Sequence, residues 1–404
     1  MDLVRSFATP GHEPIACVEL HTVGMPTRII VKGYPEISGT LAEQKAEALE
    51  QHDAIRQRIL SEPRGHFDMF GAILRPHTEL TKSHKAHMGV LYIHPDGYSN
   101  MCGHATIALG RFLVDTHDLE VFPQRDQLKY DPTTGTSLVV LHTPGGLVEV
   151  TVPTNSDGSR SDPTRPITFE AVPAFALTTD YTLPIKPENR WPELGRRDSI
   201  NVSFAYCSAF SCQVSIQELG FPHDGLQSRP MLEALRFATS QVRRTINSNE
   251  EYRSLLKVPG KPGLDRCIFG VMVVDKAWGT AHEGTRGGET GLYFFGKGHI
   301  DRSPTGSMAA ARAAVAFAKG ELSIGDSWTY HSLVSNSTST SPGLVATILR
   351  LVTSNGVSYE DHEPSARPVI VQIKGYASYT GFHTFVYEEH DHLPRKGFLL
   401  SRLE

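Results

Sequence analysis

A cysteine stands directly before a glycine and an apolar run in the segment from Ser99 to Thr106. The run is typical of a helix that begins near Gly103, so Cys102 would lie at a helix N-terminus. Such an end leaves about four N–H groups unpaired and carries roughly half a positive charge, so it binds carboxylates and lowers the pKa of a thiol. Cys102 is therefore a candidate base, and the amides of Gly103 and His104 are candidate donors to a carboxylate.

A structural interpretation of the same residues stays open. Free cysteine is among the most buried residue types, so Cys102 alone also fits an inert thiol beside a glycine turn. His104 equally fits a core histidine that caps the helix, with only its backbone amide functional.

A second helix start of this kind lies in the other half of the chain, where Asp301 to Met308 precede an alanine-rich run. Taken alone, Thr305, Gly306 and Ser307 fit an ordinary helix N-cap with a helpful proline before it. Two helix starts that each contain a glycine could instead hold one carboxylate between their two sets of backbone amides. The pair therefore predicts a site for a small acid.

The elements that must position these residues are short strands and a few helices. Strand-like runs are rich in β-branched residues and helix-like runs are periodic, without an alternating βαβ order, so two α+β halves are expected. The proline-rich stretch from Pro153 to Pro192 favours loops and a change of domain. We expect a first domain over 1–176 plus 372–404 and a second over 177–371. Helices are predicted over 40–60, 104–115, 229–246 and 306–319, and strands over 15–20, 27–33, 71–75, 89–94, 137–143, 147–152, 200–206, 212–219, 267–275, 291–296, 369–380 and 382–389.

Composition excludes several classes of protein. The 404 residues carry 39 Lys and Arg against 44 Asp and Glu, a formal charge of −5, which lacks the basic excess of a nucleic-acid binder. No apolar run approaches the roughly 18 residues of a membrane span, and no secretory signal pattern is present. Five cysteines, an odd number, indicate reduced thiols and a cytoplasmic protein. His390 and His392 supply two possible ligands without a third, so no metal is expected.

Four segments together resemble the proline racemase family. They read HTVGMPTR at 21–28, EPRGHFDMFGAIL at 62–74, MCGHATIA at 101–108 and IDRSPTGS at 300–307, and the resemblance runs from about Cys17 to Phe398. It implies a diaminopimelate epimerase-like α+β fold of two similar domains, each a curled mixed sheet around a central helix. It also implies an active site in the interdomain cleft, cofactor-independent chemistry and a possible homodimer.

The resemblance assigns a different residue to each side of the substrate, and we call these two sides the walls of the site. Racemases of this family place two cysteines on opposite faces of the substrate's α-carbon; the first falls on Cys102 and the second on Thr305. Threonine is a poor proton exchanger, because its hydroxyl pKa is far above that of cysteine. A Cys and Thr pair resembles the subgroup that dehydrates trans-3-hydroxy-L-proline to Δ1-pyrroline-2-carboxylate.

In that subgroup's chemistry Cys102 would take the Cα proton, and Thr305 would position the substrate or a water. Main-chain amides would hold the carboxylate, Asp301 would hold the charge of the ring nitrogen, and Phe295 would form an apolar wall. The expected substrate-binding residues are Gly103, His104, Asp301, Gly306, Ser307 and Phe295. Phe295 also fits an ordinary core aromatic.

Two other functions stay open. One is a proline or hydroxyproline racemase or epimerase, in which Thr305 or a water serves the second face. The other is a non-catalytic amino-acid-binding relative, because the sequence departs from the family pattern at several pocket positions. These departures are Val23, Met25, Cys207, Ser208 and Met308.

Overall fold

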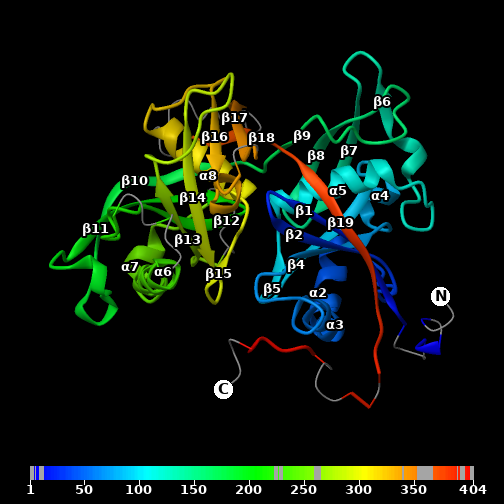
Figure 1. Cartoon of the computed structure of the whole chain (residues 1–404), viewed down its shortest axis with the longest axis horizontal. Coiled ribbons are helices and arrows are strands. Elements are labelled where there is room, and N and C mark those ends of the chain that lie inside the picture. Colours follow the sequence, from blue (N-terminus) through cyan, green and yellow to red (C-terminus); the bar gives the residue numbers. More distant parts are fainter. Residues whose placement is uncertain are drawn as a thin grey trace. The chain divides into compact units, whose positions relative to one another are not determined.

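The chain divides into two compact units, the first made of Met1–Phe169 and Gly375–Glu404 and the second of Glu170–Lys374 (Figure 1). Sequence reasoning placed these boundaries at 176/177 and 371/372, and the assignment of the units as domains stays a prediction. The computed structural model describes residues 4, 6–8, 13–222, 226, 231–258, 265–338, 341–352, 367–388, 390–391 and 396–400.

The first unit is a mixed sheet that curls around one helix, α5 (Gly103–Asp115). Its strands pair in the order β19–β1–β2–β3–β4–β7–β8–β9, antiparallel except for β2–β3 and β4–β7. The bounds are β1 Ile15–Thr22, β2 Met25–Lys32, β3 Gly71–Arg75, β4 Met88–His94, β7 Thr136–Thr143, β8 Gly146–Pro153, β9 Ile167–Glu170 and β19 Ala377–Phe385. Short strands β5 (Gly97–Ser99) and β6 (Lys129–Asp131) pair with β4 and β7.

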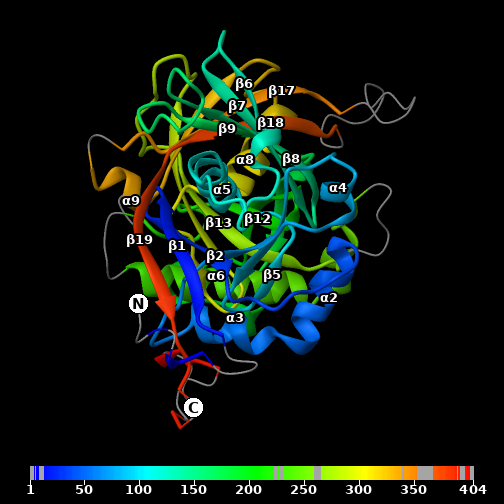
Figure 2. The same ribbon diagram turned by 90° about the vertical axis from the view of Figure 1, so that its right-hand side faces the viewer.

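Helix α5 is buried on nearly every side, which its apolar sequence requires. Only Arg111 and Asp115 of the helix are not buried. It packs against β1, β2, β8 and β19, as Figure 2 shows. A Cβ on Gly110 would lie 2.6 Å from a methyl carbon of Val150, so the close approach of α5 to β8 requires glycine there.

The second unit repeats this plan around α8 (Gly306–Ala318). Its strands pair in the order β10–β11–β12–β13–β14–β16–β17–β18, antiparallel except for β12–β13 and β14–β16. The bounds are β10 Phe175–Pro184, β11 Ser199–Cys207, β12 Ala209–Ser215, β13 Ile268–Asp275, β14 Gly288–Phe295, β16 Ser327–His331, β17 Leu344–Leu351 and β18 Val369–Gly375. A short strand, β15 (His299–Ile300), pairs with the end of β14.

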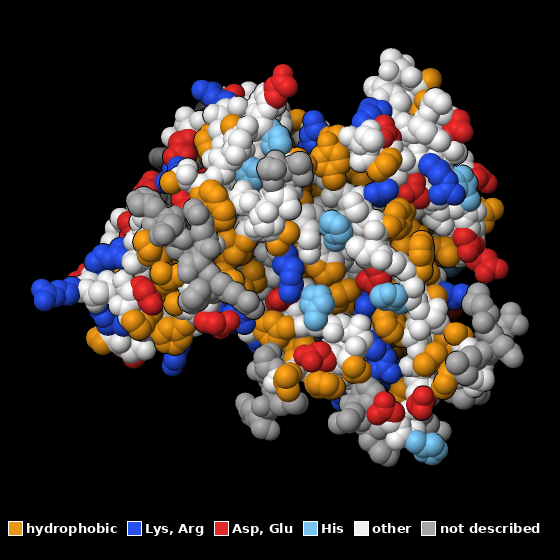
Figure 3. Space-filling model, viewed as in Figure 1, with side chains coloured by type: hydrophobic (Ala, Val, Ile, Leu, Met, Phe, Trp, Pro, Cys, Tyr) orange, Lys and Arg blue, Asp and Glu red, His pale blue; other side chains and the backbone are white. Residues whose placement is uncertain are grey.

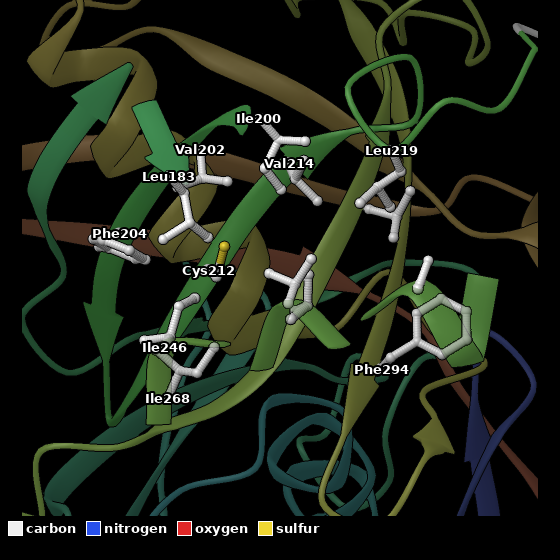
Figure 4. Close-up of a cluster of buried hydrophobic side chains, with 14 of the residues drawn as sticks. Leu183, Ile200, Val202, Phe204, Cys212, Val214, Leu219, Ile246, Ile268 and Phe294 are labelled. Carbon is white, nitrogen blue, oxygen red and sulfur yellow. The ribbon is translucent and has the colours of Figure 1, made fainter. Parts of the chain in front are cut away.

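The outer face of this second sheet is covered by α6 (Met231–Asn247) and α7 (Glu250–Ser254). Side chains from β10 to β14 and from α6 form its hydrophobic core (Figure 4). Phe294 points into this core, so strand alternation directs Phe295 to the opposite face of the sheet. Glu289 shares the face of Phe295 and forms an ion pair with Arg312 of α8, which identifies that face as the α8 side.

The two units are therefore similar in the order and direction of their strands. In each unit a short hairpin strand, β5 or β15, comes immediately before the central helix. Cys102 and Thr305 are the N-cap residues of these two helices, so they occupy equivalent positions in the two units. The predicted α+β plan of two similar halves is confirmed.

Several predicted elements need correction. The helix predicted over 40–60 is two helices, α2 (Leu41–Gln51) and α3 (Asp53–Leu60), because His52 leaves the helical conformation at φ −122° and ψ 7°. The loops predicted from Pro153 to Pro192 contain β9 and β10, since prolines there lie at strand ends or between strands. The strand predicted over 212–219 ends at Ser215, where a turn follows. The strand predicted over 382–389 ends at Phe385, because residues 386–388 are not in a strand.

Charges of both signs are interspersed on the face drawn in Figure 3. Within the described ranges, no helix combines the length and the apolar character needed to cross a membrane.

Candidate active site

The start of α5 presents a cysteine and a set of backbone donors. Cys102 is the N-cap residue in an extended conformation, with φ −141° and ψ 110°, and in the described part of the chain no side chain caps this end. The first intrahelical bond runs from the Thr106 N–H to the Cys102 carbonyl at 2.9 Å. The amides of residues 103–105 therefore have no acceptor within the helix, and the helix dipole favours an anion beside them.

Hydrogen bonds from the sheet fix the main chain of this helix start. The Thr106 hydroxyl donates to the Cys102 carbonyl at 2.8 Å and accepts from the Tyr92 hydroxyl at 2.7 Å. Burial raises the pKa of Tyr92, so the phenol stays a neutral donor. From β1, the Thr22 hydroxyl donates to the His104 carbonyl at 2.9 Å.

The sulfur of Cys102 lies against an imidazole ring. Its Sγ is 3.5 Å from both Nδ1 and Nε2 of His104. The His104 ring stands edge-on to Phe70, with ring centroids 4.9 Å apart, and is 2% exposed. The side chain of His104 thus contacts the thiol as well as packing in the core, and the choice between a structural and a functional role stays a prediction.

Other cysteines are poorly suited to proton chemistry. Burial raises the pKa of Cys17 and of Cys207 to about 12, and it also raises the pKa of Cys212. These three thiols stay protonated near neutral pH. All five cysteines, each within the described residues, are free of disulfides.

The start of α8 presents a threonine in an unusual backbone conformation. Thr305 has φ 57° and ψ 100°, a region that a β-branched residue rarely adopts. The residue is 7% exposed, and its Oγ1 has no hydrogen-bond partner among the described residues. The first intrahelical bond joins the Ala309 N–H to the Thr305 carbonyl at 2.8 Å. The amides of Gly306, Ser307 and Met308 thus have no intrahelical acceptor either.

Four other helices in the described chain, α2, α4 (Glu79–Lys82), α7 and α9 (Leu333–Asn336), are capped by their own residues, whereas α3 has no side-chain cap. Thr40 of α2 and Thr78 of α4 form capping boxes, and so does Ser332 of α9. Asn249 accepts from the Glu251 N–H at the start of α7. A side-chain cap contributes about 1 kcal/mol, and neither α5 nor α8 has one in the described structure. In α5 and α8 these amides are thus not used by an N-cap side chain, unlike those of the four capped helices.

A short hydrogen-bonded chain leads from Asp301 to Thr305. The Ser303 N–H and hydroxyl donate to Asp301 Oδ1 at 2.8 and 2.7 Å, and the Thr305 N–H donates to Ser303 Oγ at 3.1 Å. The Asp301 N–H donates to the Tyr293 carbonyl of β14 at 3.1 Å. One carboxylate oxygen of Asp301 thus accepts two hydrogen bonds from Ser303, which ties the carboxylate to the start of α8.

Phe295 lies in a stack of rings on the α8 side of the second sheet. Its ring centroid is 5.5 Å from Phe269, 5.6 Å from Tyr293 and 5.3 Å from His299. The structure thus brings Asp301, Thr305 and the start of α8 together through Ser303, and Cys102, Gly103 and His104 together at α5. Phe295 belongs to the aromatic stack and not to the hydrogen-bonded chain.

The sequence departures lie at tight turns or in the core. Val23, in the β1–β2 turn, and Ser208, in the β11–β12 turn, have φ of 50° and 64°, where glycine is usual. Cys207 Sγ approaches the Val172 carbonyl at 3.7 Å. Met25 and Met308 are buried. The two strained turns are topologically equivalent, one in each unit.

Sequence reasoning missed the residues that fix the two helix starts. Thr22 and Ser303 lie inside the segments HTVGMPTR and IDRSPTGS, so their place in those motifs was a usable signal. Tyr92 is an ordinary strand residue, and nothing in the sequence marks it. In the described part of the chain no group of three or more possible metal ligands is present, and His392 lies outside that part.

Comparison with known proteins shows similarity over nearly the whole chain. A sequence model described as proline racemase matches residues 17–399. Trans-L-3-hydroxyproline dehydratase of Pongo abelii and trans-3-hydroxy-L-proline dehydratase of Homo sapiens are each 33% identical, over 97% of this chain and 96% of their own. A trans-3-hydroxy-L-proline dehydratase of Bacillus thuringiensis is 30% identical over 95% of this chain and 97% of its own.

Two solved structures share the fold. A probable proline racemase from Agrobacterium radiobacter, with bound carbonate, has a TM-score of 0.71 at 20% identity and covers 96% of this chain and 97% of its own. A hydroxyproline epimerase from Agrobacterium vitis, with bound trans-4-hydroxy-L-proline, has a TM-score of 0.71 at 21% identity and covers 96% and 95%.

Proposed function

Because the chain belongs to the proline racemase family, we propose that it is a hydro-lyase that converts trans-3-hydroxy-L-proline to Δ1-pyrroline-2-carboxylate and water. The proposal is supported by the names of relatives at 30–33% identity that align over nearly the full chain. The observation that carries it is the unlike pair at two equivalent helix starts, a thiol at Cys102 and, at Thr305, a hydroxyl that has no partner among the described residues.

Dehydration needs a base on one face of the substrate only. In trans-3-hydroxy-L-proline the Cα hydrogen and the 3-hydroxyl lie on the same ring face, because both are opposite the carboxylate. Cys102, as a thiolate, takes the Cα proton, and the electron pair of the C–H bond forms the Cα–Cβ double bond. The hydroxyl leaves with that proton as water. The resulting enamine tautomerises to the cyclic imine.

Main-chain donors hold the substrate's acid group during this step. The amides of Gly103 and His104 at one helix start and of Gly306 and Ser307 at the other bind the carboxylate and stabilise the enolate-like charge. Preorganised donors of this kind usually supply the largest part of catalysis. Asp301 holds the positive charge of the ring nitrogen, and Phe295 packs against the apolar part of the ring.

Thr305 takes a positioning role on the second face. Its hydroxyl has a pKa far above that of a thiol, so it exchanges protons poorly near neutral pH. A buried hydroxyl without a partner costs about 1–3 kcal/mol relative to a paired one, and the substrate or a bound water supplies the missing partner. The active site therefore has one proton-transfer wall and one hydrogen-bonding wall.

The test is incubation of the protein with four imino acids, followed by detection of a cyclic imine. Trans-3-hydroxy-L-proline is expected to give the imine, whereas cis-3-hydroxy-L-proline, trans-4-hydroxy-L-proline and L-proline are expected to give none. Loss of optical rotation from L-proline or epimerisation of a hydroxyproline, without imine, would identify a racemase or epimerase. Thermal stabilisation by these ligands without turnover would identify a binding protein.

The setting proposed for this reaction is the cytoplasm. It is supported by the five cysteines, which are all free thiols, since exported proteins commonly pair theirs. Fractionation of cells with an antibody against the chain checks this, and recovery in an exported or membrane fraction would contradict it.

A further inference from the structure

We propose that Ser303 is a positioning residue, whose hydroxyl joins the Asp301 carboxylate to the Thr305 main chain and so directs the Thr305 hydroxyl toward the substrate. This inference rests on the proposed dehydratase function and adds to it the residue that organises its second wall. Ser303 itself touches neither the substrate nor the reacting atoms in this scheme.

The first support is the geometry around Ser303, which is 1% exposed. Its hydroxyl acts in both directions, because Oγ donates to Asp301 Oδ1 at 2.7 Å and accepts from the Thr305 N–H at 3.1 Å. Asp301 is 3% exposed, so this chain runs through the protein interior, where hydrogen bonds to a charged group are strong. The position of the Thr305 main chain is thus tied to a residue that we assign to the substrate's ring nitrogen.

The second support is the conformation that this chain holds. With φ 57° and ψ 100°, Thr305 does not turn its hydroxyl onto the amides of its own helix. Thr40, Thr78 and Ser332, the N-cap residues of α2, α4 and α9, have φ from −122° to −68°, and each caps its helix. A threonine released from the Asp301–Ser303 chain is expected to relax toward that ordinary N-cap geometry.

Relaxation of Thr305 to an ordinary N-cap geometry would remove two features of the proposed active site at once. The Thr305 hydroxyl would bond to its own helix, and the amides of Gly306 to Met308 would lose capacity for a carboxylate. The expected result is weaker substrate binding and slower turnover, although the fold would gain a normal helix cap. This combination distinguishes positioning from simple support of the loop, because loss of support would lower stability.

The loop is also held from another direction. Ser332 donates from its hydroxyl to the Arg302 carbonyl at 2.6 Å, so removal of the Ser303 hydroxyl alone leaves that attachment in place. The effect of Ser303 substitution should therefore be local to Thr305. Ser335, a buried serine in the capping box of α9, serves as a matched control outside the active-site residues.

The experiment compares the full-length enzyme with Ser303→Ala, Ser303→Thr, Thr305→Ala, the double variant and Ser335→Ala. Ser303→Ala is expected to lower kcat/KM for trans-3-hydroxy-L-proline by about 10- to 100-fold, in the range for a lost hydrogen bond to a charged group. Ser303→Thr keeps a hydroxyl and should recover most of the activity. Ser335→Ala should stay within about twofold, the size of an indirect effect of less than 1 kcal/mol.

The decisive comparison is non-additivity. If Ser303 acts through Thr305, the double variant should be no slower than Thr305→Ala alone. Multiplication of the two losses would overturn the proposal, as would a Ser303→Ala enzyme within threefold of the unmodified one. Ser303→Cys, similar in size but a weak hydrogen-bonding group, provides the same comparison if the alanine variant does not fold.

The failure of each hypothesis has its own signature. An unmodified enzyme that produces no imine overturns the dehydratase function and this inference with it. An unmodified enzyme that produces imine, with a Ser303→Ala variant of equal activity, overturns the role of Ser303 alone.

Discussion

The starts of α5 and α8 occupy equivalent positions in the two units, yet their first residues are held in opposite ways. Cys102 is extended, and its sulfur lies against the His104 ring. Thr305 has a positive φ, and its hydroxyl has no partner among the described residues. The repeated fold thus presents a helix start without a side-chain cap in each unit, and the two starts differ in their N-cap residue.

The means of support differ as well. Tyr92 and Thr106 fix Cys102 through its carbonyl, whereas Ser303 fixes Thr305 through its N–H. The first arrangement leaves a thiol in contact with the imidazole ring of His104. The second leaves a neutral hydroxyl on Thr305, whose N–H ends the hydrogen-bonded chain from Asp301 through Ser303. This difference agrees with the roles that we propose, a base at Cys102 and a hydrogen-bonding residue at Thr305.

The largest effect is expected at Cys102. Cys102→Ser replaces the thiol by an alcohol of far higher pKa, so imine formation should fall by about 10³-fold or more, near the upper part of the range for loss of a general base. Calorimetric binding of trans-3-hydroxy-L-proline should persist, since the amides stay in place. A serine variant with more than a tenth of the original kcat would show that Cys102 is not the base.

Removal of the second wall should have a smaller effect. Thr305→Ala deletes the hydroxyl without touching the base, and a loss of about 10- to 100-fold in kcat/KM is expected, in the range for one or two buried hydrogen bonds. Thr305→Ser should retain most activity because it keeps the donor. Equal rates for the alanine variant and the unmodified enzyme would remove Thr305 from the site.

A more similar pair of walls should change the reaction's stereochemistry rather than its rate. Thr305→Cys places a thiol at both helix starts, so it is expected to keep dehydration within about tenfold and to add slow inversion at Cα. Chromatography that separates trans-3-hydroxy-L-proline from cis-3-hydroxy-D-proline measures this. A Thr305→Cys enzyme that never forms the cis isomer would show that the two helix starts do not share one substrate.

The smallest effect on catalysis is expected where a helix is capped in the ordinary way. Thr40→Ala removes the capping box of α2 and should lower the free energy of unfolding by about 1 kcal/mol, with kcat unchanged. Denaturant unfolding and steady-state rates measure the two quantities. A loss of activity without a loss of stability would contradict the purely structural role expected for the capped helix α2.

Much of this comparison follows from local sequence. The predicted helices over 104–115, 229–246 and 306–319 differ from α5, α6 and α8 by at most two residues at either end. Apolar periodicity and glycine at the helix starts are local signals, so they identified the N-terminal ends of α5 and α8. The roles assigned to Cys102 and Thr305 stay predictions.

Other features depend on tertiary structure and could not be read from the sequence. The break at His52, where φ is −122° and ψ 7°, is not marked by a glycine or a proline in the sequence. Strand β10 forms within a proline-rich stretch because β11 pairs with it along its length. A positive φ is not expected for threonine, so the sequence does not predict the conformation of Thr305. The structure shows this conformation together with the hydrogen bonds from Asp301 through Ser303 that hold the Thr305 main chain.

The most direct test of one-sided proton removal is the configuration of substrate recovered at partial conversion by the unmodified enzyme. Trans-3-hydroxy-L-proline should be the only 3-hydroxyproline that remains beside the imine, because no base serves the second face. Accumulation of cis-3-hydroxy-D-proline would contradict this account, since it requires protonation of Cα from the wall of Thr305.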